Sequence, residues 1–296
     1  MEMAIHFPNI GIHLEYVPRL LQIYGFQISI YGILLAVGML LGAAYVVVLA
    51  KRANQNPNDY LDMIILAGIG AAAGGHLFYV LLHMEALRAD MSQLWNFRNG
   101  GFILYGALLG GCLMVLLFCV VKKCSLWKAA DIICMGALLV QITGRLGNFF
   151  NRECFGDYTD TLLAMQIPAD FVRPAEMTAL MEEKKTFIEG TAFVQVHPAF
   201  LYEALWCLLL FLFLMKYRHI RKFSGEIFAV YLLGYSLGRI WIEGLRADRV
   251  LIPGTYLPIS QVIAAVLIVI CALWVLIGRY MARKRRNARR KQEDSL

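Results

Sequence analysis

Long apolar segments constrain this chain more than any other feature of its sequence. Seven runs are long enough to cross about 30 Å of hydrocarbon as helices. They lie near residues 23–49, 61–82, 102–121, 130–150, 198–215, 226–245 and 258–278. Only 17% of the residues are charged and 59% are hydrophobic, unlike the composition of an average soluble domain. We therefore predict an all-α, polytopic integral membrane protein with about seven transmembrane helices.

The basic residues predict the orientation of these helices. Seventeen of the 28 Lys and Arg residues lie in the loops after the first, third and fifth runs or in the C-terminal tail, and nine lie on the other side. The positive-inside rule then places the N-terminus outside and the C-terminus in the cytoplasm. The basic cytoplasmic tail, residues 279–296, either contacts anionic lipid head groups or is simply solvated, and we favour the solvated state. Because the net charge of +7 follows this topology, we expect no nucleic-acid partner.

Two segments bear on the domain organisation. The N-terminus has no basic region ahead of an apolar stretch and no small-residue cleavage site, so we expect no cleaved signal peptide. Residues 152–196 form a connection much longer than is usual between helices. They contain Pro168, Pro174 and a helix-like stretch at 175–185, which predicts a small ordered extracytoplasmic cap. We expect the cap to be an insertion in a single transmembrane enzyme domain, residues 1–296.

Glycines recur at helical spacing in the second and third runs. They are Gly68, Gly70, Gly74, Gly75, Gly106, Gly110 and Gly111. Small residues let two membrane helices approach closely, so helix packing explains them without a further function.

Two of the apolar runs contain an arginine, which is costly in a membrane unless it faces a polar cavity or a partner. In each run the arginine belongs to a polar stripe on one helical face. The first stripe is Gln141, Arg145, Asn148 and Arg152, and the second is Tyr235, Arg239, Glu243 and Arg246. We predict that both stripes converge on a phosphate, whose oxygens accept paired hydrogen bonds from guanidinium groups.

A purely structural role for the two arginines is the alternative. Arg145 and Arg239 would each pair with an internal carboxylate, such as Glu203 or Glu243, and hold helices together. Few acidic residues lie at membrane level, however. This predicts a positive charge without compensation, which favours an anionic ligand.

Other polar residues mark the membrane boundary. Arg152 and Arg246 lie at the ends of their runs and are expected to extend toward the interface. His197 opens the fifth run, in His197-Pro-Ala-Phe-Leu-Tyr202-Glu203. It serves either as a proton acceptor or as an ordinary polar residue at a helix entry.

One segment resembles a known family signature. The run Gly144-Arg145-Leu-Gly147-Asn148-Phe-Phe-Asn151-Arg-Glu153-Cys-Phe-Gly156 is similar to GRxGNFxNxExxG of the bacterial prolipoprotein diacylglyceryl transferases. Further landmarks follow in the family's order: Tyr31-Gly32, Gly100-Gly101, His197-Pro-x-x-Leu-Tyr202-Glu203 and Arg239-x-x-x-Glu243-x-x-Arg246. The resemblance covers nearly the whole chain.

The resemblance implies an enzyme of the bacterial plasma membrane. Its reaction would transfer the sn-1,2-diacylglyceryl group from phosphatidylglycerol to the lipobox cysteine thiol of a prolipoprotein signal peptide and release glycerol phosphate. This is the first step of bacterial lipoprotein maturation. The implied partners are these two substrates and the lipid bilayer, and neither a metal nor a soluble cofactor is implied.

The resemblance also assigns roles to residues. It implies that Arg145, Arg239 and Tyr105 are catalytic. The implied phosphatidylglycerol-binding residues are Arg145, Asn148, Tyr31, Glu153, Gly156, Tyr235, Glu243, Arg246 and His197. Some family members have His at the position of Tyr105, so this residue either accepts a proton or only orients the thiol. Without the resemblance, Tyr31 and Tyr105 would be assigned to core packing.

Two alternatives come from other functional classes. A transporter of an anionic solute would show an inverted repeat with broken helices, and neither is visible in the sequence. An intramembrane hydrolase would be indicated by a GxSxG or HExxH motif, and the sequence has neither.

Overall fold

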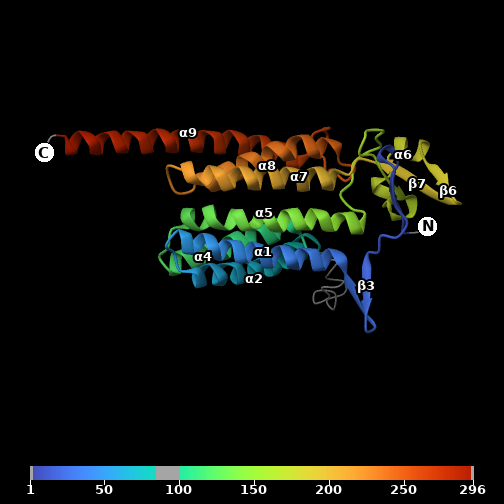
Figure 1. The fold of residues 1–296 in the computed structure, drawn as a ribbon, viewed down its shortest axis with the longest axis horizontal. Helices are drawn as coiled ribbons and strands as arrows, with labels where there is room; N and C mark the ends of the chain where they lie inside the picture. The colour runs from blue at the N-terminus through green and yellow to red at the C-terminus, as the bar shows by residue number, and fades with distance from the viewer. Residues whose placement is uncertain (1–2, 85–100, 295–296) are drawn as a thin grey trace. The chain divides into compact units, whose positions relative to one another are not determined.

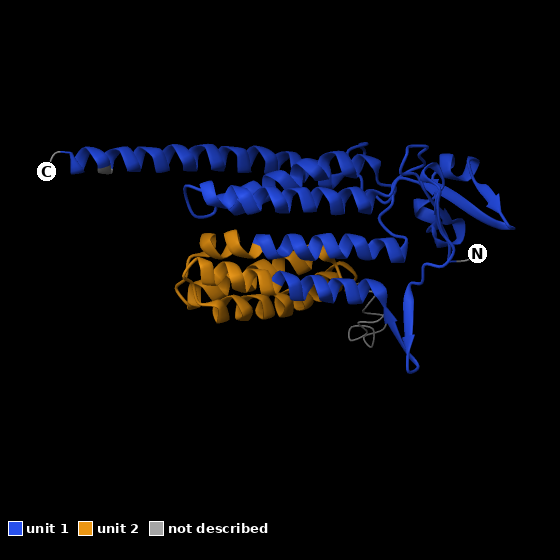
Figure 2. Cartoon of the chain, in the orientation of Figure 1, with its two compact units in different colours: residues 1–42, 134–296 blue, residues 43–133 orange. Residues whose placement is uncertain are grey.

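The computed structural model describes residues 3–84 and 101–294 (Figure 1). Gly100, one of the expected landmarks, lies outside this range. The chain forms two compact units, shown in Figure 2. The larger unit contains residues 1–42 and 134–296, and the smaller unit contains residues 43–133.

The structure is mostly helical. Its α-helices are α1 (Ile30–Arg52), α2 (Pro57–Leu82), α4 (Leu104–Val121), α5 (Leu126–Asn151), α6 (Ala179–Glu183), α7 (Ala199–Tyr217), α8 (Glu226–Leu245) and α9 (Ile259–Glu293). Within the described residues, six are long and apolar enough to cross a membrane: α1, α2, α4, α5, α7 and α9. The prediction of a multi-pass membrane protein is therefore confirmed.

Helix α8 coincides with the expected sixth run, 226–245, but it is not one of the six. It contains the charged residues Arg239 and Glu243, which lower its mean hydropathy. Both charges are engaged in ion pairs inside the larger unit, as described below. The seventh span thus stays a prediction. The mean hydropathy of α8 is low because of Arg239 and Glu243, whose charges are paired within the protein.

Two helix boundaries differ from the predicted runs. Residues 20–29 form a hairpin of β3 (Leu20–Ile23) and β4 (Phe26–Ser29), so α1 begins seven residues later than the predicted 23. Tyr24 and Gly25 both have positive φ and make the tight turn of this hairpin. The hydropathy of a short apolar run does not distinguish a strand from a helix. At the other end, α9 continues through the basic tail to Glu293.

The smaller unit is held together by close contact between α2 and α4. A Cβ atom added to Gly74 would lie 2.4 Å from the carbonyl oxygen of Gly106. One added to Gly110 would lie 2.1 Å from the carbonyl oxygen of Gly70. The backbones therefore touch where glycine removes the side chain, as predicted for these four residues. Gly68 differs, because nothing lies within 4 Å of its added Cβ.

A β-sheet in the larger unit corrects the all-α prediction. Its strand order is β2-β1-β5-β7-β6. The strands are β1 (Ile5–Phe7), β2 (Ile12–Leu14), β5 (Met165–Pro168), β6 (Thr186–Ile188) and β7 (Thr191–Val196). The long connection 152–196 supplies three of them, and the N-terminal segment adds β1 beside β5. In the stretch expected to be helical, 175–185, only the short helix α6 is an α-helix.

The sheet has its own apolar core, which joins it to the helices. Ile5, Met165, Ile167 and Val194 are fully buried there, together with Phe200 from the start of α7. These residues alternate along their strands, as expected when one face of a sheet is covered. The N-terminal strand β1 and the strands of the connection 152–196 therefore share one core with the start of α7.

Arg152 ties the N-terminal segment to the end of α5. Its φ of 57° ends the helix, and its side chain is buried, 1% exposed. It donates hydrogen bonds to the carbonyl oxygens of Met3 (2.8 Å) and Val17 (2.9 Å), and its guanidinium lies 4.4 Å from the ring centre of Phe171. The prediction that Arg152 extends the α5 stripe toward the membrane interface is therefore wrong. The cause is the break in the helix after Asn151.

We predict that Gly74→Val destabilises the protein while Gly68→Val does not. A side chain at position 74 must push α2 away from α4, at a cost of about 1–3 kcal/mol. The same change at position 68 meets open space. Thermal unfolding of the two variants in the same detergent measures the difference. Equal unfolding temperatures would contradict the proposed close packing.

Candidate functional site

The carboxylate of Glu203, on α7, lies between three arginines in the larger unit. Its Oε1 is 2.7 Å from Nη2 of Arg145, on α5. Its Oε2 is 3.5 Å from Nη1 of Arg239, on α8, and 3.8 Å from Nη1 of Arg246, just beyond α8. Glu203 is 3% exposed. The predicted convergence of the two arginine-bearing stripes therefore occurs, around a buried carboxylate.

Two further carboxylates complete this cluster. Arg239 Nη2 is 2.6 Å from Oε2 of Glu243, one turn along α8. Arg246 grips Asp248 with two parallel hydrogen bonds of 2.7 and 2.6 Å, the strong geometry for this pair. Three arginines thus face three carboxylates. The expectation of uncompensated positive charge is wrong, because Asp248 pairs with Arg246 and Glu203 pairs with several arginines.

The ion pair between Arg246 and Asp248 shifts the pKa of both groups. Burial by itself would raise the pKa of Asp248, but the hydrogen bonds and the charge of Arg246 hold it below its usual range. Burial opposes the charge on Arg246, yet Asp248 raises the pKa of the guanidinium. The side chain of Arg246 is only 10% exposed. Its predicted extension to the interface is therefore also wrong.

Backbone contacts at Gly156 bring the three segments of the site together. The amide of Gly156 donates to the carbonyl of His197 (2.8 Å), and the next amide, of Asp157, donates to the carbonyl of Leu245 (2.9 Å). A Cβ atom at Gly156 would lie 2.4 Å from the Leu245 carbonyl oxygen. Only glycine allows this approach. Gly156, the last residue of the signature, therefore lies between the start of α7 and the end of α8.

Cys154 lies between two of the arginines. Nη1 of Arg145 and Nη2 of Arg246 each donate to its Sγ over 3.4 Å. Burial raises the pKa of this thiol, and the two arginines oppose that shift only in part. The thiol is therefore protonated near neutral pH. A thiol sulfur is a weak hydrogen-bond acceptor, so both guanidinium groups can exchange it for a stronger one.

Several predicted residues lie close to this cluster. The hydroxyl of Tyr235 donates to Oε1 of Glu203 (3.2 Å). Asn148 is buried on α5, three residues after Arg145. Tyr31, at the start of α1, packs on the neighbouring Gly147, where a Cβ atom would lie 2.7 Å from its ring. These residues come from the three helices α8, α5 and α1 of the larger unit.

His197 and Glu153 lie at the margin of the cluster. Nδ1 of His197 is 3.4 Å from the hydroxyl oxygen of Tyr202. Burial lowers the pKa of the imidazole, and Asp157 opposes the shift only in part, so His197 is neutral near pH 7. Glu153 lies 3.5 Å from the exposed Arg173 of the sheet region. This ion pair is directed toward the sheet region.

Tyr105 belongs to the smaller unit, near the start of α4. Its side chain is 55% exposed. Its role therefore stays a prediction that depends on the family resemblance.

Sequence reasoning missed part of the site. The sequence analysis gives Glu203 only as a possible ion-pair partner, although a carboxylate inside an apolar run is a functional signal by itself. Asp248 follows Arg246 by two residues and carries no comparable signal. The spacing of Cys154 in the sequence does not predict its contacts with Arg145 and Arg246.

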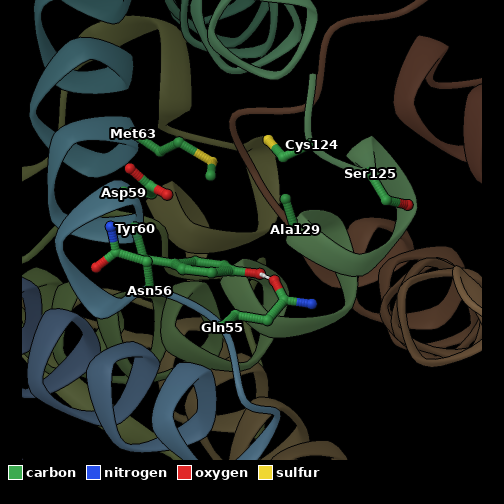
Figure 3. A pocket seen from close by; sticks show the side chains of 8 residues that line it. All are labelled: Gln55, Asn56, Asp59, Tyr60, Met63, Cys124, Ser125 and Ala129. Atoms are coloured by element: carbon green, nitrogen blue, oxygen red, sulfur yellow. Dashed lines mark hydrogen bonds between the residues drawn. The ribbon is translucent and has the colours of Figure 1, made fainter. Parts of the chain in front are cut away.

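The smaller unit contains a separate hollow of about 210 Å³ (Figure 3). It lies where α1 connects to α2 and α4 connects to α5. In it the Tyr60 hydroxyl bonds to the side-chain oxygen of Gln55, and Asp59 is 3.7 Å from Lys122. These partners belong to the loop ends themselves. We assign the hollow no catalytic role.

We predict that Arg145 and Glu203 are energetically coupled. Arg145→Gln removes the nearest partner of the buried Glu203, and Glu203→Gln removes that of Arg145, so each single change destabilises the fold. The double variant removes both charges, so its loss is smaller than the sum, with a coupling of about 1–3 kcal/mol. Chemical unfolding of the four proteins in detergent measures the cycle. Strictly additive losses would show that the ion pair contributes nothing.

Comparisons with known proteins give one consistent result. The profile of the prolipoprotein diacylglyceryl transferase family matches residues 18–277. Proteins named phosphatidylglycerol--prolipoprotein diacylglyceryl transferase are similar along most of the chain. The one from Acaryochloris marina is 36% identical over 84% of this chain and 86% of its own length. Those from Synechococcus elongatus and Clostridioides difficile are 34% and 31% identical, over 92% and 90% of this chain and 90% and 95% of theirs.

Proposed function

The chain belongs to the prolipoprotein diacylglyceryl transferase family, and from this membership we propose the reaction it catalyses. It transfers the sn-1,2-diacylglyceryl group of phosphatidylglycerol to the lipobox cysteine thiol of a prolipoprotein signal peptide. A bond forms between the sulfur and the glycerol carbon, and the bond from that carbon to the phosphate oxygen breaks. The thiol loses its proton, and glycerol phosphate leaves with one more negative charge than the diester carried.

The observation that carries this proposal is the cluster of Arg145, Arg239 and Arg246 around one point. The phosphate gains charge as the carbon–oxygen bond breaks, and positioned cations stabilise that charge in the transition state. Guanidinium groups suit the task, because they bind two phosphate oxygens at once and stay protonated. They come from two different helices and a loop end, so the fold sets their spacing.

The carboxylates support this role instead of excluding it. Glu203, Glu243 and Asp248 hold the guanidinium groups in place before the lipid arrives. Each arginine has five N–H donors, so it can keep a carboxylate and still bind a ligand. The donors of Arg145 and Arg246 that end at Cys154 are the ones a phosphate oxygen would take over.

The proposed roles follow this geometry. Arg145 and Arg239 are catalytic, since they contact the phosphate as its charge develops. Other residues bind the lipid head group or keep the binding residues in position. They are Asn148, Tyr31, Glu153, Gly156, Tyr235, Glu243, Arg246 and His197.

The proposed setting is the bacterial plasma membrane, with seven spans and one enzyme domain over residues 1–296. The N-terminus lies outside, residues 152–196 form an extracytoplasmic cap, and the basic tail 279–296 lies in the cytoplasm. The arginine cluster sits where α5 and α8 end beside this cap. It therefore faces the outer leaflet, where the signal peptide of an exported prolipoprotein presents its cysteine.

We predict that Arg145→Ala lowers transfer roughly a hundredfold or more, because it removes one of the charges that stabilise the leaving phosphate. The assay uses purified protein, labelled phosphatidylglycerol and a lipobox peptide, and measures label on the peptide thiol. Arg145→Lys keeps the charge and the pairing with Glu203 but loses the planar fork, so it should fold normally and still transfer poorly.

Cys154→Ala is the matched control for this assay. It removes the weak acceptor shared by Arg145 and Arg246 while leaving both cations, so transfer should persist within a few-fold. Loss of transfer in Cys154→Ala would contradict the proposal that a phosphate oxygen replaces the Cys154 sulfur as the acceptor for Arg145 and Arg246. Absence of transfer by the unaltered protein, under conditions in which a relative is active, would refute the proposed reaction.

Tyr105 is proposed as the third catalytic residue, acting on the acceptor thiol. We predict that Tyr105→Phe, which removes only the hydroxyl, lowers transfer at least about tenfold, while Tyr105→His retains most of it. Initial rates of transfer are measured at saturating phosphatidylglycerol, so that an effect on the reaction is separated from an effect on lipid binding. Full activity in Tyr105→Phe would refute the proposed catalytic role of the Tyr105 hydroxyl.

A further inference from the structure

Helix α9 is too long to lie wholly within a bilayer. It contains 35 residues. At 1.5 Å per residue it is about 50 Å long, while the hydrocarbon core is about 30 Å thick. Its apolar first part forms a candidate span, and its C-terminal part is basic. In Figure 1, α9 extends beyond the connection between α7 and α8, at the end of the helix away from the sheet.

A groove lies beside α9 where the apolar part gives way to the basic part. Its volume is about 1100 Å³. We call it the α9 groove, and it is lined by Lys222, Phe223, Ser224, Trp274, Ile277, Gly278, Arg279, Met281, Ala282, Arg283, Arg285 and Arg286. All of these residues belong to the larger unit and are distinct from the arginine cluster around Glu203.

Packing and hydrogen bonds hold the residues beside the α9 groove in place. Phe223 packs on Gly278, where a Cβ atom would lie 2.4 Å from its ring. Arg279 donates to Oε1 of the fully buried Glu226 (2.6 Å) and to the hydroxyl of Tyr217 (2.9 Å). These contacts connect α9 to α7 and to the start of α8. The side chains that line the groove are therefore presented by a preformed surface.

The lining combines two chemical features. Of the described residues that line it, five are basic and none is acidic. The carboxylate nearest to Arg279 belongs to Glu226, which that arginine already engages, so Arg283, Arg285 and Arg286 supply the charge for a ligand. On the membrane side, Trp274, Ile277 and Met281 supply apolar surface. A ligand that fits must carry negative charge and an apolar chain next to each other.

We infer that the α9 groove binds an anionic phospholipid, with the phosphate at Arg283, Arg285 and Arg286 and the acyl chains along Trp274 and Ile277. Basic residues close to the end of a membrane span attract anionic lipid head groups. The apolar surface beside the span distinguishes this site from a simple solvated tail, and from a groove for nucleic acid. In the proposed orientation the lipid belongs to the cytoplasmic leaflet, but binding itself requires only that α9 span the membrane.

The test compares two variants that lose the same charge. R283Q/R285Q/R286Q removes three cations that line the groove. K284Q/R290Q/K291Q removes three cations from the same helix that do not line it. Full-length protein in detergent is titrated with dioleoylphosphatidylserine or dioleoylphosphatidylcholine, and native mass spectrometry counts bound lipid. Phosphatidylserine replaces phosphatidylglycerol as the probe so that turnover of the substrate does not enter the measurement.

The groove variant should bind phosphatidylserine at least about tenfold more weakly than the unaltered protein, and the control variant within twofold of it. Phosphatidylcholine should bind weakly to all three. Equal losses in both variants would overturn the inference in favour of diffuse charge. Equal binding of the two lipids, or binding of a short RNA in place of phosphatidylserine, would overturn it as well. The transfer assay of the arginine cluster does not bear on these outcomes, so the two proposals fail separately.

Discussion

Charge compensation in an apolar environment is the constraint on which the rest of this structure depends. A guanidinium inside a membrane helix is tolerated only beside a partner, and a buried carboxylate needs one equally. Glu203 meets both needs, since it lies within ion-pairing distance of Arg145, Arg239 and Arg246. The ends of α5, α7 and α8 are thereby drawn to one point. The site is an electrostatic tie among these helices, and it is the place where we propose that the anionic substrate binds.

Close backbone approach makes this arrangement possible. Gly156 allows the chain after α5 to pass between His197 and Leu245, with hydrogen bonds on both sides. Arg152 then turns away into the sheet region and binds the carbonyl oxygens of the N-terminal segment. One short stretch of chain thus positions the arginine cluster and anchors the sheet. A substitution in this stretch would therefore affect both regions.

The arginine cluster combines strong contacts with weak ones. The strong ion pairs hold the arginines in fixed positions, while the contacts with Cys154 are weak and replaceable. Preorganised cations stabilise a developing charge without having to rearrange during the reaction. The groove beside α9 follows a different design, since its cations border an apolar surface and are mostly exposed. The first arrangement suits a reaction and the second suits retention of a lipid.

The sequence by itself determined the membrane class, most helix positions and the stripes that bear Arg145 and Arg239, because hydropathy and helical periodicity are local properties. The signature from Gly144 to Gly156 also determined the family, since it is contiguous. Only the tertiary structure decided that Glu203 and Cys154 lie among the arginines, that Asp248 neutralises Arg246, and that β1 joins a sheet with β5. Those pairings join residues far apart in the chain, or depend on how a loop turns. Single-residue patterns do not encode them, because the energy of each pairing exists only once both partners are in place.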